Sequence, residues 1–340
     1  TITLNYTNYE TYKTEESAIL NRSAKPTFAW INNLGNFLFD KIELYFNEKL
    51  IDTHHSHWIN IWYELNNDYN KKELLEKMIG ATKDLTDLNS TTKPSKHLLI
   101  PLYFWFCRYS ELNLPLIAML YESIYINLKV ADINKLVRKP SSTKVVIGDL
   151  NVSLKGHYIY LDKMERSLFS SKQHEYLIST IQYNTLENIY SHTVTTDLNF
   201  ENNITSLYWI ISDDSNIYNK DISNYSLENT QNSKNPILTT TITTNEAIIM
   251  NYDGTYTNYL IPYEKYKSTP SDGINVYTFS LNSKYQPSGN LNFSKLHNVK
   301  MKINIDTSMT NLTDKKLFVY ANSYSILQIM GGQVNKLIHK

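Results

Sequence analysis

The sequence predicts an all-β protein built from two β-sandwiches in tandem, with short helical insertions. From about residue 184 onward, helical periodicity disappears and short apolar runs are separated by Asn, Asp, Ser, Gly and Pro, which is typical of a sandwich or barrel. The length of 340 residues and the apolar content of 41% suit two domains with substantial cores. Because there are only 9 glycines and no Gly-rich phosphate loop, a nucleotide-binding α/β fold is disfavoured.

The first half is expected to begin with short strands and a β-hairpin. Residues 1–6 and 26–31 indicate one or two early strands. Residues 37–46 alternate between polar and apolar side chains, a turn follows, and 50–52 return along the first strand. This alternation predicts a hairpin with one buried face.

A helical insertion is predicted next, over about 54–80. Trp58, Ile61, Trp62 and Leu65 recur at helical spacing, and residues 71–79 continue the pattern over two further turns. The polar stretch that follows is expected to be a loop that returns the chain to the sheet.

Residues 98–130 form the longest nearly continuous apolar and aromatic run of the chain. A polar break from Arg108 to Asn113, with Pro115 behind it, divides the run into two pieces, which favours a buried antiparallel pair of strands. Cys107 lies inside the run and is the only cysteine, so we expect a core thiol, no disulfide within one chain and a reducing compartment.

The join between the halves is expected near residue 172. The β-branched run 145–147 and residues 156–161 indicate strands, and Asp162 is a suitable N-cap for a short helix over 162–169. A strand at 174–183 follows, so the predicted domains are 1–172 and 173–340. Further strands are predicted at 207–211, 247–252, 255–261, 276–281, 299–305, 317–320 and 325–330.

The two halves echo one another in the order of their segments. Each contains a hairpin-like segment, a pair of aromatic strands joined through a proline, and a closing strand. The matched segments are 42–52 with 248–255, 103–130 with 277–305 (through Pro115 and Pro287), and 158–161 with 324–329. Two tandem copies of one β-sandwich would explain this echo.

Charge and hydropathy argue against several classes of partner. The 33 basic residues balance the 33 acidic residues, so overall charge does not attract the chain to nucleic acid or to an anionic membrane. No run of 18 apolar residues is free of charge, and the first residues lack a signal-like pattern. Because the sequence lacks an initiator Met, we expect a processed or incomplete product.

No catalytic, cofactor or metal residues are predicted. His54, His55 and His57 are the only obvious metal candidates, but adjacent histidines point in different directions and no cysteine or well-spaced histidine accompanies them. A polar start to the helix is the preferred interpretation. The acidic pairs at 15–16 and 213–214 have no spacing that would fix two carboxylates across a substrate, and no base accompanies Cys107.

Aromatic residues leave a second function open. Those within strands are expected in the core, whereas loop tyrosines could serve a protein interface or stack on a glycan. These loop residues are Tyr218, Tyr225, Tyr263, Tyr266 and Tyr285. A β-sandwich carbohydrate-binding module therefore remains an alternative hypothesis.

Several motifs, in order along the chain, resemble those of one protein family. They are 39–65 with Ile51, Asp52, His54 and Trp58; Ile-Pro-Leu-Tyr-Phe-Trp-Phe at 100–106; 114–122; 158–162; 165–167; 174–178; Gln-Pro-Ser-Gly-Asn-Leu-Asn-Phe-Ser at 286–294; and the closing motif 319–332. Together these segments resemble the double jelly-roll major capsid proteins of nucleocytoplasmic large DNA viruses, a group that includes iridoviruses, phycodnaviruses and mimiviruses.

The resemblance implies two tandem eight-stranded jelly rolls and a homotrimer that forms a pseudo-hexagonal capsomer of an icosahedral shell. It implies neighbouring capsomers and minor capsid or cement proteins as partners, no direct nucleic acid contact and no membrane insertion, although an internal virion membrane can lie beneath the shell. Location in the virion and assembly in the host cytoplasm follow. A paralogous minor capsid or scaffold protein is the alternative within the same fold.

The chain departs from the family in length. It is shorter than usual, so we expect missing N-terminal residues that supply an arm and the first strands of the first jelly roll. The loops of the second half are brief, so any decoration on the virion exterior is expected to be small. Long polar excursions from a rigid sandwich commonly make contacts, which gives 131–144, 212–235 and 262–274 as candidate contact segments.

Overall fold

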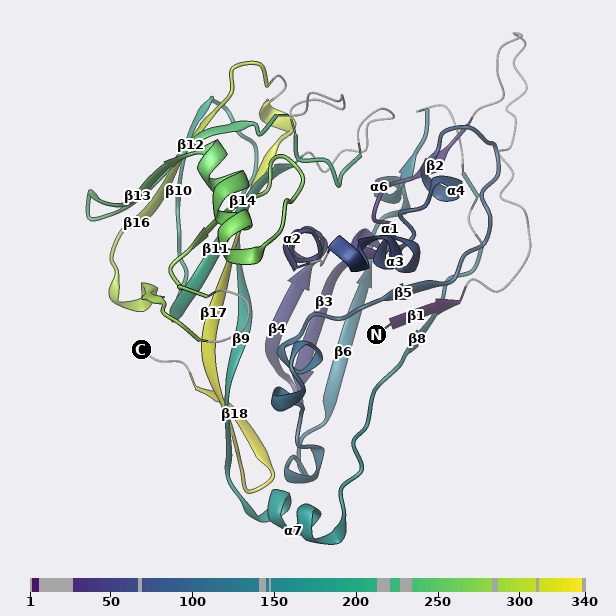
Figure 1. The fold of residues 1–340 in the computed structure, drawn as a ribbon, viewed down its shortest axis with the longest axis vertical. Helices are drawn as coiled ribbons and strands as arrows, with labels where there is room; N and C mark the ends of the chain where they lie inside the picture. Colours follow the sequence, from purple (N-terminus) through teal and green to yellow (C-terminus); the bar gives the residue numbers. More distant parts are fainter. Residues whose placement is uncertain are drawn as a thin grey trace.

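Antiparallel sheets built from residues before helix α7 (Lys163–Ser171) lie beside antiparallel sheets built from residues after it, and α7 connects the two groups at one end of the molecule (Figure 1). The computed structural model describes residues 2–5, 27–66, 69–140, 145–146, 148–212, 221–226, 234–282, 287–309 and 312–337. Every strand pairing among these residues joins two strands on the same side of helix α7. The predicted strands at 1–6 and 26–31 coincide with β1 (Ile2–Asn5) and β2 (Ala29–Trp30). The acidic pairs at 15–16 and 213–214, with Tyr218 and Tyr285, lie outside the described residues.

Two sheets packed face to face form the second half (Figure 1). The larger sheet contains β14 (Asn275–Thr278), β11 (Asn203–Ser212), β17 (Lys316–Met330) and β18 (Gln333–Leu337), with β15 (Leu291–Asn292) paired to β11 and β9 (His174–Leu186) paired to β17. The smaller sheet contains β10 (Thr193–Asp197), β16 (Val299–Ile305), β12 (Ile237–Thr244) and β13 (Ala247–Asp253).

Strand β11 is buried on both faces. Leu207 and Trp209 point to the core between the two sheets of the second half, whereas Tyr208 and Ile210 point to a core shared with the first half. Successive side chains of a strand point to opposite faces, so a sheet covered on both sides has apolar residues at nearly every position. The larger sheet is therefore the central layer of the molecule.

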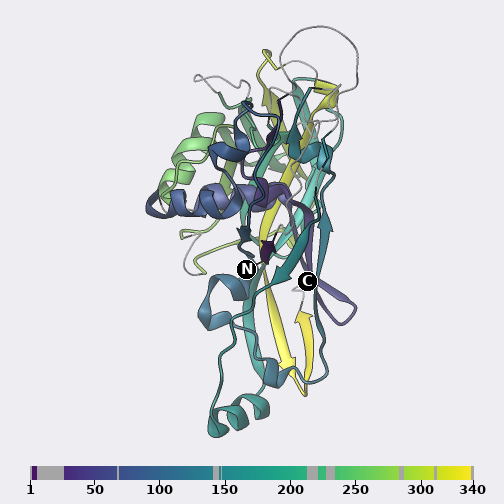
Figure 2. The ribbon, with the colours of Figure 1, turned by 90° about the vertical axis from the view of Figure 1, so that its right-hand side faces the viewer.

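The first half consists of small sheets covered by helices. One sheet contains β4 (Lys49–His55), β3 (Phe39–Phe46) and β6 (Ile124–Val130); a second contains β5 (Leu98–Ile100), β1 and β8 (Asn151–Leu154); and β2 pairs with β7 (Val137–Arg138). The helices are α1 (Leu34–Phe37), α2 (Ser56–Asn66), α3 (Tyr69–Ile79), α4 (Lys83–Thr86), α5 (Trp105–Arg108) and α6 (Ile133–Leu136). Figure 2 shows α1 to α3 on one side of the sheets. The predicted hairpin is β3–β4 and the predicted helical insertion is α2–α3, so both are confirmed.

The predicted strand pair at 98–130 is wrong. Strand β5 pairs with β1 and strand β6 pairs with β3, and between them lie α5 and the 3₁₀ turns η1 (Ser110–Leu112) and η2 (Leu116–Ala118). The aromatic side chains between the two strands fill the core from loops and short helices, with Phe104 and Trp105 both buried. Cys107 is exposed on α5 rather than buried in a strand.

Three more predictions about secondary structure are wrong. Residues 156–161 form an exposed segment that joins no sheet. Residues 255–261 are helical and include η3 (Tyr256–Leu260). The Asp253 carboxylate accepts the N–H of Tyr256 at 2.7 Å and so caps the start of this helical turn. The predicted pair 277–294 with 299–305 does not form, since β14 and β15 pair with β11 and β16 pairs with β10 and β12.

Other predictions in the second half are confirmed or refined. Strand β9 contains the predicted 174–183, β16 matches 299–305, and the predicted strands 317–320 and 325–330 are one long strand, β17. Strands β10, β12 and β18 were not predicted. Asp162 caps α7 in a capping box, accepting the N–H of Glu165 at 2.8 Å while the Glu165 carboxylate accepts the N–H of Asp162 at 2.9 Å.

Candidate functional site

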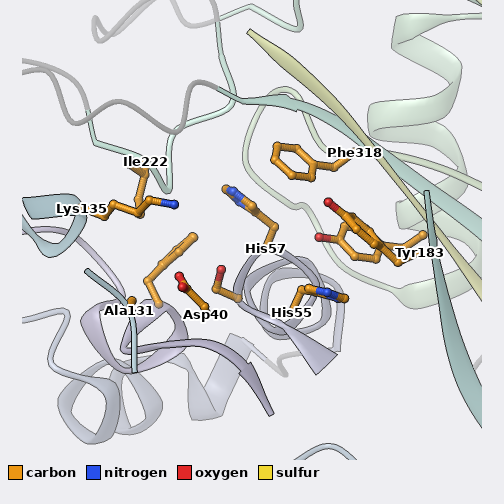
Figure 3. A pocket seen from close by; sticks show the side chains of 11 residues that line it. Asp40, His55, His57, Ala131, Lys135, Tyr183, Ile222 and Phe318 are labelled. Atoms are coloured by element: carbon orange, nitrogen blue, oxygen red, sulfur yellow. The ribbon is translucent and has the colours of Figure 1, made fainter. Parts of the chain in front are cut away.

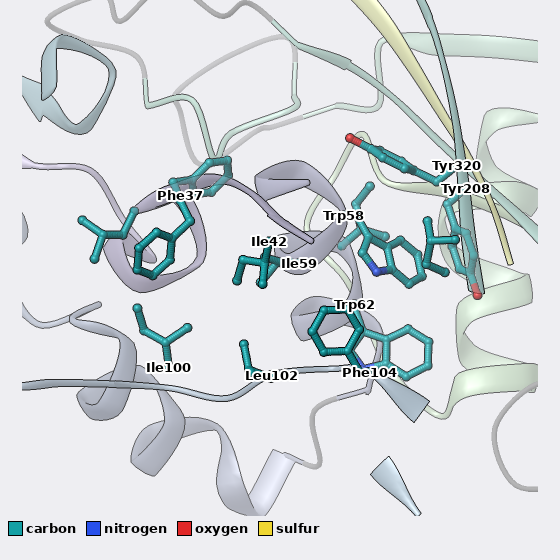
Figure 4. Close-up of a cluster of buried hydrophobic side chains, with 14 of the residues drawn as sticks. Phe37, Ile42, Trp58, Ile59, Trp62, Ile100, Leu102, Phe104, Tyr208 and Tyr320 are labelled. Atoms are coloured by element: carbon teal, nitrogen blue, oxygen red, sulfur yellow. The ribbon is translucent and has the colours of Figure 1, made fainter. Parts of the chain in front are cut away.

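Helix α2 and the end of β4 face the central sheet and form the contact zone between the two halves, which we call the seam. Trp58 on α2 packs edge-on against Tyr208 of β11 with ring centroids 5.0 Å apart, and lies 6.0 Å from Tyr320 of β17 (Figure 4). One continuous core contains these side chains together with Phe104 and Ile42 of the first half. One hydrophobic core therefore extends through both halves, in addition to the contacts between their surfaces.

Asp52 is the buried anion of the seam. Its Oδ1 accepts the N–H of Ile181 in β9 at 2.9 Å, and its Oδ2 lies 3.1 Å from His54 Nε2. The Lys336 ammonium group of β18 acts on Asp52 as a nearby positive charge, and it donates to the Ile51 carbonyl oxygen at 2.9 Å. Burial acts to raise the pKa of Asp52, but His54, the Ile181 N–H and Lys336 together lower it below its ordinary value. The carboxylate is therefore ionised at neutral pH and links β4 to two strands of the second half.

The three histidine rings of the predicted cluster point to different partners. His54 stacks on Phe104 at 4.4 Å beside Asp52, His55 stacks on Tyr183 at 4.3 Å, and His57 Nδ1 lies 3.1 Å from the Tyr225 hydroxyl. His54 and His55 end β4, and α2 begins at Ser56. Within the described ranges no group of three His, Cys, Asp or Glu side chains is placed to hold a metal ion. The histidines thus act as seam contacts.

Tyr225 anchors a polar network around Asn60 of α2. Asn60 Nδ2 donates to the Tyr225 hydroxyl at 3.3 Å, and Asn60 Oδ1 accepts from Asn33 at 3.0 Å and from Asn36 at 3.2 Å. Tyr225 is buried. Its assignment as a loop aromatic available to a glycan was therefore wrong, because a ring enclosed in the seam cannot stack on a ligand.

Tyr266 gives a second correction of the same kind. Its ring is buried, and its hydroxyl lies 2.7 Å from that of Tyr208. Tyr263 alone among the described loop tyrosines of that prediction is exposed. Loop position predicted exposure for these residues, but tertiary packing of η4 (Pro262–Tyr266) turns one ring inward.

A cavity of about 160 Å³ lies within the seam (Figure 3). Asp40, His57 and Lys135 line it from the first half, and Tyr183 and Phe318 line it from the second. His55 also lines it, and burial, with the neighbouring His54, Lys41 and His57 acting in the same direction, lowers the pKa of His55 to about 4. His55 is therefore neutral at physiological pH.

A second group of contacts across the seam joins residues 108–122 to β9 and to the β17–β18 hairpin. The Glu122 carboxylate accepts the N–H of Val334 at 2.9 Å, and the N–H of Tyr121 donates to the Gly332 carbonyl oxygen at 3.0 Å. The Arg108 guanidinium donates to Ser179 Oγ at 2.6 Å and lies 4.7 Å from the centre of the Trp62 indole ring. Arg108, the first residue of the polar break in the apolar run, thus makes a contact across the seam.

Sequence reasoning missed most of these seam residues as a group. The sequence motifs include Asp52 and His54, but no sequence pattern assigns a role between the two halves to Asn60, Tyr225 or Lys336. The available signal is an acidic residue, Asp52, directly after the apolar Leu50 and Ile51 in a predicted strand, since a charge is buried only where a partner compensates it.

Two family models together match most of the chain. The family model described as "Large eukaryotic DNA virus major capsid protein" matches residues 165–335, and the model "Major capsid protein N-terminus" matches residues 2–162. The chain is similar to "Probable capsid protein 4" of Acanthamoeba polyphaga mimivirus, at 24% identity over 93% of this chain and 81% of that protein. It is also similar to the major capsid protein of Pyramimonas orientalis virus, at 28% identity over 88% of this chain and 76% of that protein.

Solved structures show the same fold. The quasi-atomic model of the PBCV-1 virus capsid superposes with a TM-score of 0.77 at 20% identity, covering 100% of this chain and 89% of that chain. The Faustovirus major capsid protein superposes with a TM-score of 0.73 at 11% identity, covering 94% of this chain and 76% of that chain. The predicted fold class, a double jelly roll, is confirmed, and so is the resemblance drawn from the sequence motifs. The chain therefore belongs to the large eukaryotic DNA virus major capsid protein family, and it is a structural capsid protein rather than an enzyme.

Proposed function

We propose that this capsid protein is a major shell subunit that assembles as a homotrimer, forming a pseudo-hexagonal capsomer of an icosahedral virus shell. Three copies of a chain with two similar lateral units give a six-fold outline around a three-fold axis. Family membership and the double jelly-roll fold support this proposal.

The division into units at 1–172 and 173–340 is part of the proposal. Its support is that all strand pairings of the described residues stay on one side of α7. The shared core at the seam makes the two units one rigid building block, because separating them would expose Trp58 and Tyr208.

The observation that carries the trimer is the outward-facing apolar surface of the first half. Tyr125 of β6 is 56% exposed and Leu154 of β8 is 57% exposed, and Val130 and Val152 on the same strands are also exposed. Both strands are the edges of their sheets, and exposed apolar side chains on an edge strand are typical of a strand that another subunit covers. The segment 262–274 presents Tyr263 as a further contact candidate.

Size-exclusion chromatography with light scattering tests this proposal. One chain has a mass of 39.7 kDa, so a trimer has three times that mass. Leu154→Arg is expected to shift the protein toward monomer, because it places a charge in the covered surface. Ile248→Arg, at another exposed apolar side chain, is the matched control. A wild-type protein that stays monomeric at high concentration would refute the trimer.

Copy number in the particle separates a major from a minor capsid protein. As a family member the chain is located in the virion capsid, where it takes part in a self-assembling shell. We propose in addition that it contacts neighbouring capsomers and minor capsid or cement proteins, that it assembles in the host cytoplasm without binding nucleic acid, and that it needs no catalytic, metal or cofactor site. Quantitative proteomics of purified virions is expected to find it as the most abundant shell protein.

A further inference from the structure

Each half of the chain has a helix directly after a β-hairpin. In the first half, the hairpin β3–β4 ends at His55 and α2 begins at Ser56. In the second half, the hairpin β12–β13 ends at Asp253, and the helical segment 254–266, which contains η3 and η4, begins at the next residue. One further strand pairs with the first strand of each hairpin, β6 with β3 and β16 with β12. Figure 2 shows the two helices on the same side of the sheets. They therefore occupy corresponding positions in the two halves.

The two helices differ in how they are covered. Most residues of α2 are buried, and Trp58 packs against Tyr208 of the second half. On the helix of the second half, Tyr259 is 47% exposed, Leu260 is 41% exposed and Tyr263 is 67% exposed. We call these three side chains, which lie within one helical turn of each other, the outer stripe. An apolar stripe on a helix normally faces a core or a partner, and the outer stripe is not covered as α2 is at the seam.

The sheets of the two halves show the same difference. In each half a strand near the start pairs antiparallel with a strand near the end, β1 with β8 and β9 with β17. Most of β17 is buried, and its Tyr320 lies against Trp58 of α2. All four residues of β8 are exposed, and Val152 and Leu154, two residues apart, point to the same face. The first half therefore leaves open the surface that corresponds to the second-half side of the seam.

Hydrogen bonds fix the surroundings of the outer stripe. The Tyr259 hydroxyl donates to Asp272 Oδ1 at 2.6 Å, so this ring is held in place although it is exposed. Lys265 Nζ donates to the Leu281 carbonyl oxygen at 3.4 Å, which places Leu281, 80% exposed, beside the same helix. Side chains that are ordered before association lose little conformational freedom on docking. The stripe is therefore suited to a preformed apolar surface.

We propose that the outer stripe of one copy docks on β8 of the next copy and so repeats the seam between chains. Within one chain, the helix of the first half packs on the β9–β17 pair of the second half. Between chains, the helix of the second half packs on the β1–β8 pair of the first half, and one kind of contact covers both open surfaces. Because the stripe and β8 are different surfaces, the contact is head-to-tail and generates a ring. This inference rests on the trimer proposed above and names the two surfaces that join its copies.

Site-directed cross-linking of the full chain tests the contact directly. Cys107 is the only cysteine and is exposed, so Cys107→Ser gives a background without thiols. On that background, Tyr263→Cys with Leu154→Cys and a short bis-maleimide should yield cross-linked dimers and trimers on a denaturing gel. Ile248→Cys with Leu154→Cys is the matched control, since Ile248 is exposed on the second half but lies outside the stripe, and it should remain a single chain of 39.7 kDa.

Charge complementation gives an independent measurement by light scattering. Tyr263→Glu alone and Leu154→Arg alone should each weaken association about tenfold or more, because each places a charge in the covered surface. The two together should restore most of the trimer, since the new charges face one another, whereas Ile248→Glu with Leu154→Arg should not.

The outcomes separate this inference from the trimer itself. A wild-type trimer in which Tyr263→Cys and Leu154→Cys do not cross-link, and in which the charge pair does not restore association, would overturn the repeated seam and leave the trimer standing. A wild-type protein that stays monomeric would overturn both. Cross-linking of the Ile248→Cys control as strongly as the Tyr263→Cys variant would also overturn the assignment, because it would show contact without preference for the stripe.

Discussion

Acidification should loosen the seam through His55, which connects the end of β4 to Tyr183 of the central sheet. The pKa of His55 falls from the ordinary value of 6.5 to about 4 in the folded chain, mainly through burial. Between these values the unfolded chain binds a proton that the folded chain does not. The stabilisation is complete above the unfolded pKa and is lost as pH falls toward the folded pKa.

The magnitude follows from the two pKa values. At 1.36 kcal/mol per pKa unit, the full linkage is about 3.4 kcal/mol, and about 2.5 kcal/mol of it is lost by about pH 4.5. His55→Phe keeps an aromatic ring against Tyr183 but cannot be protonated. The variant should therefore unfold at nearly the wild-type urea concentration at about pH 7.5, and be relatively more stable than wild type by about 2.5 kcal/mol at about pH 4.5.

Urea unfolding followed by tryptophan fluorescence measures this difference, because Trp58 and Trp62 lie in the seam core. His297→Gln is the matched control, since His297 is exposed and its loss should leave the pH dependence unchanged. Parallel pH profiles for wild type and His55→Phe would refute the reasoning, because they would show that His55 takes up its proton equally in both states.

Three further substitutions test the seam and its surroundings. Asp52→Asn removes the buried anion beside His54 and should cost about 3 to 5 kcal/mol in free energy of unfolding, measured in urea at neutral pH. Tyr208→Phe removes a buried hydroxyl that lies 2.7 Å from that of Tyr266 and should lower the free energy of unfolding by about 1 to 2 kcal/mol. Gly273→Ala places a methyl group against the Tyr225 carbonyl oxygen at a φ of +94° and should lower the melting temperature by an amount equivalent to about 3 kcal/mol or more.

Each of these three substitutions has a matched control at an exposed or open site. Asp314→Asn changes an exposed acid, Tyr259→Phe removes a hydroxyl from an exposed tyrosine, and Gly331→Ala adds a methyl group with no atom within 4 Å, at a φ of +60°. The first two controls should cost about 1 kcal/mol or less. Gly331→Ala should cost about 1 to 2 kcal/mol, because only the backbone conformation is strained there. If Asp52→Asn were as mild as Asp314→Asn, the carboxylate would not be the charge that holds β4 to β9. If Tyr208→Phe and Tyr259→Phe lowered the free energy of unfolding equally, burial would not be the cause of the effect at Tyr208. The same holds for Gly273→Ala compared with Gly331→Ala.

The helices and strands that depend on short-range sequence patterns could be predicted. The β3–β4 hairpin follows from alternation over 37–46, α2 and α3 follow from a repeat of 3.6 residues, and the start of α7 follows from a capping residue at Asp162. These signals are determined by neighbours within a few residues along the chain. They therefore persist in whatever fold surrounds them.

Strand pairing could not be predicted in the same way. The run 98–130 contains enough apolar residues for two paired strands, yet β5 and β6 join different sheets. An apolar run indicates that a segment is buried. It does not indicate whether the backbone hydrogen bonds of that segment form within it or with a distant strand. For the same reason, residues 255–261 could be read as a strand although they are helical.

The sequence by itself determined the all-β class, the two-part organisation of motifs and the family to which those motifs lead, because these depend on composition, periodicity and short segments in order. Only the tertiary structure decided the seam. The Asp52 carboxylate meets the Ile181 N–H, and the His57 ring meets the Tyr225 hydroxyl, across separations of more than a hundred residues. The partners of a buried polar group are fixed by how whole sheets pack, and that packing is a property of the folded chain rather than of any segment.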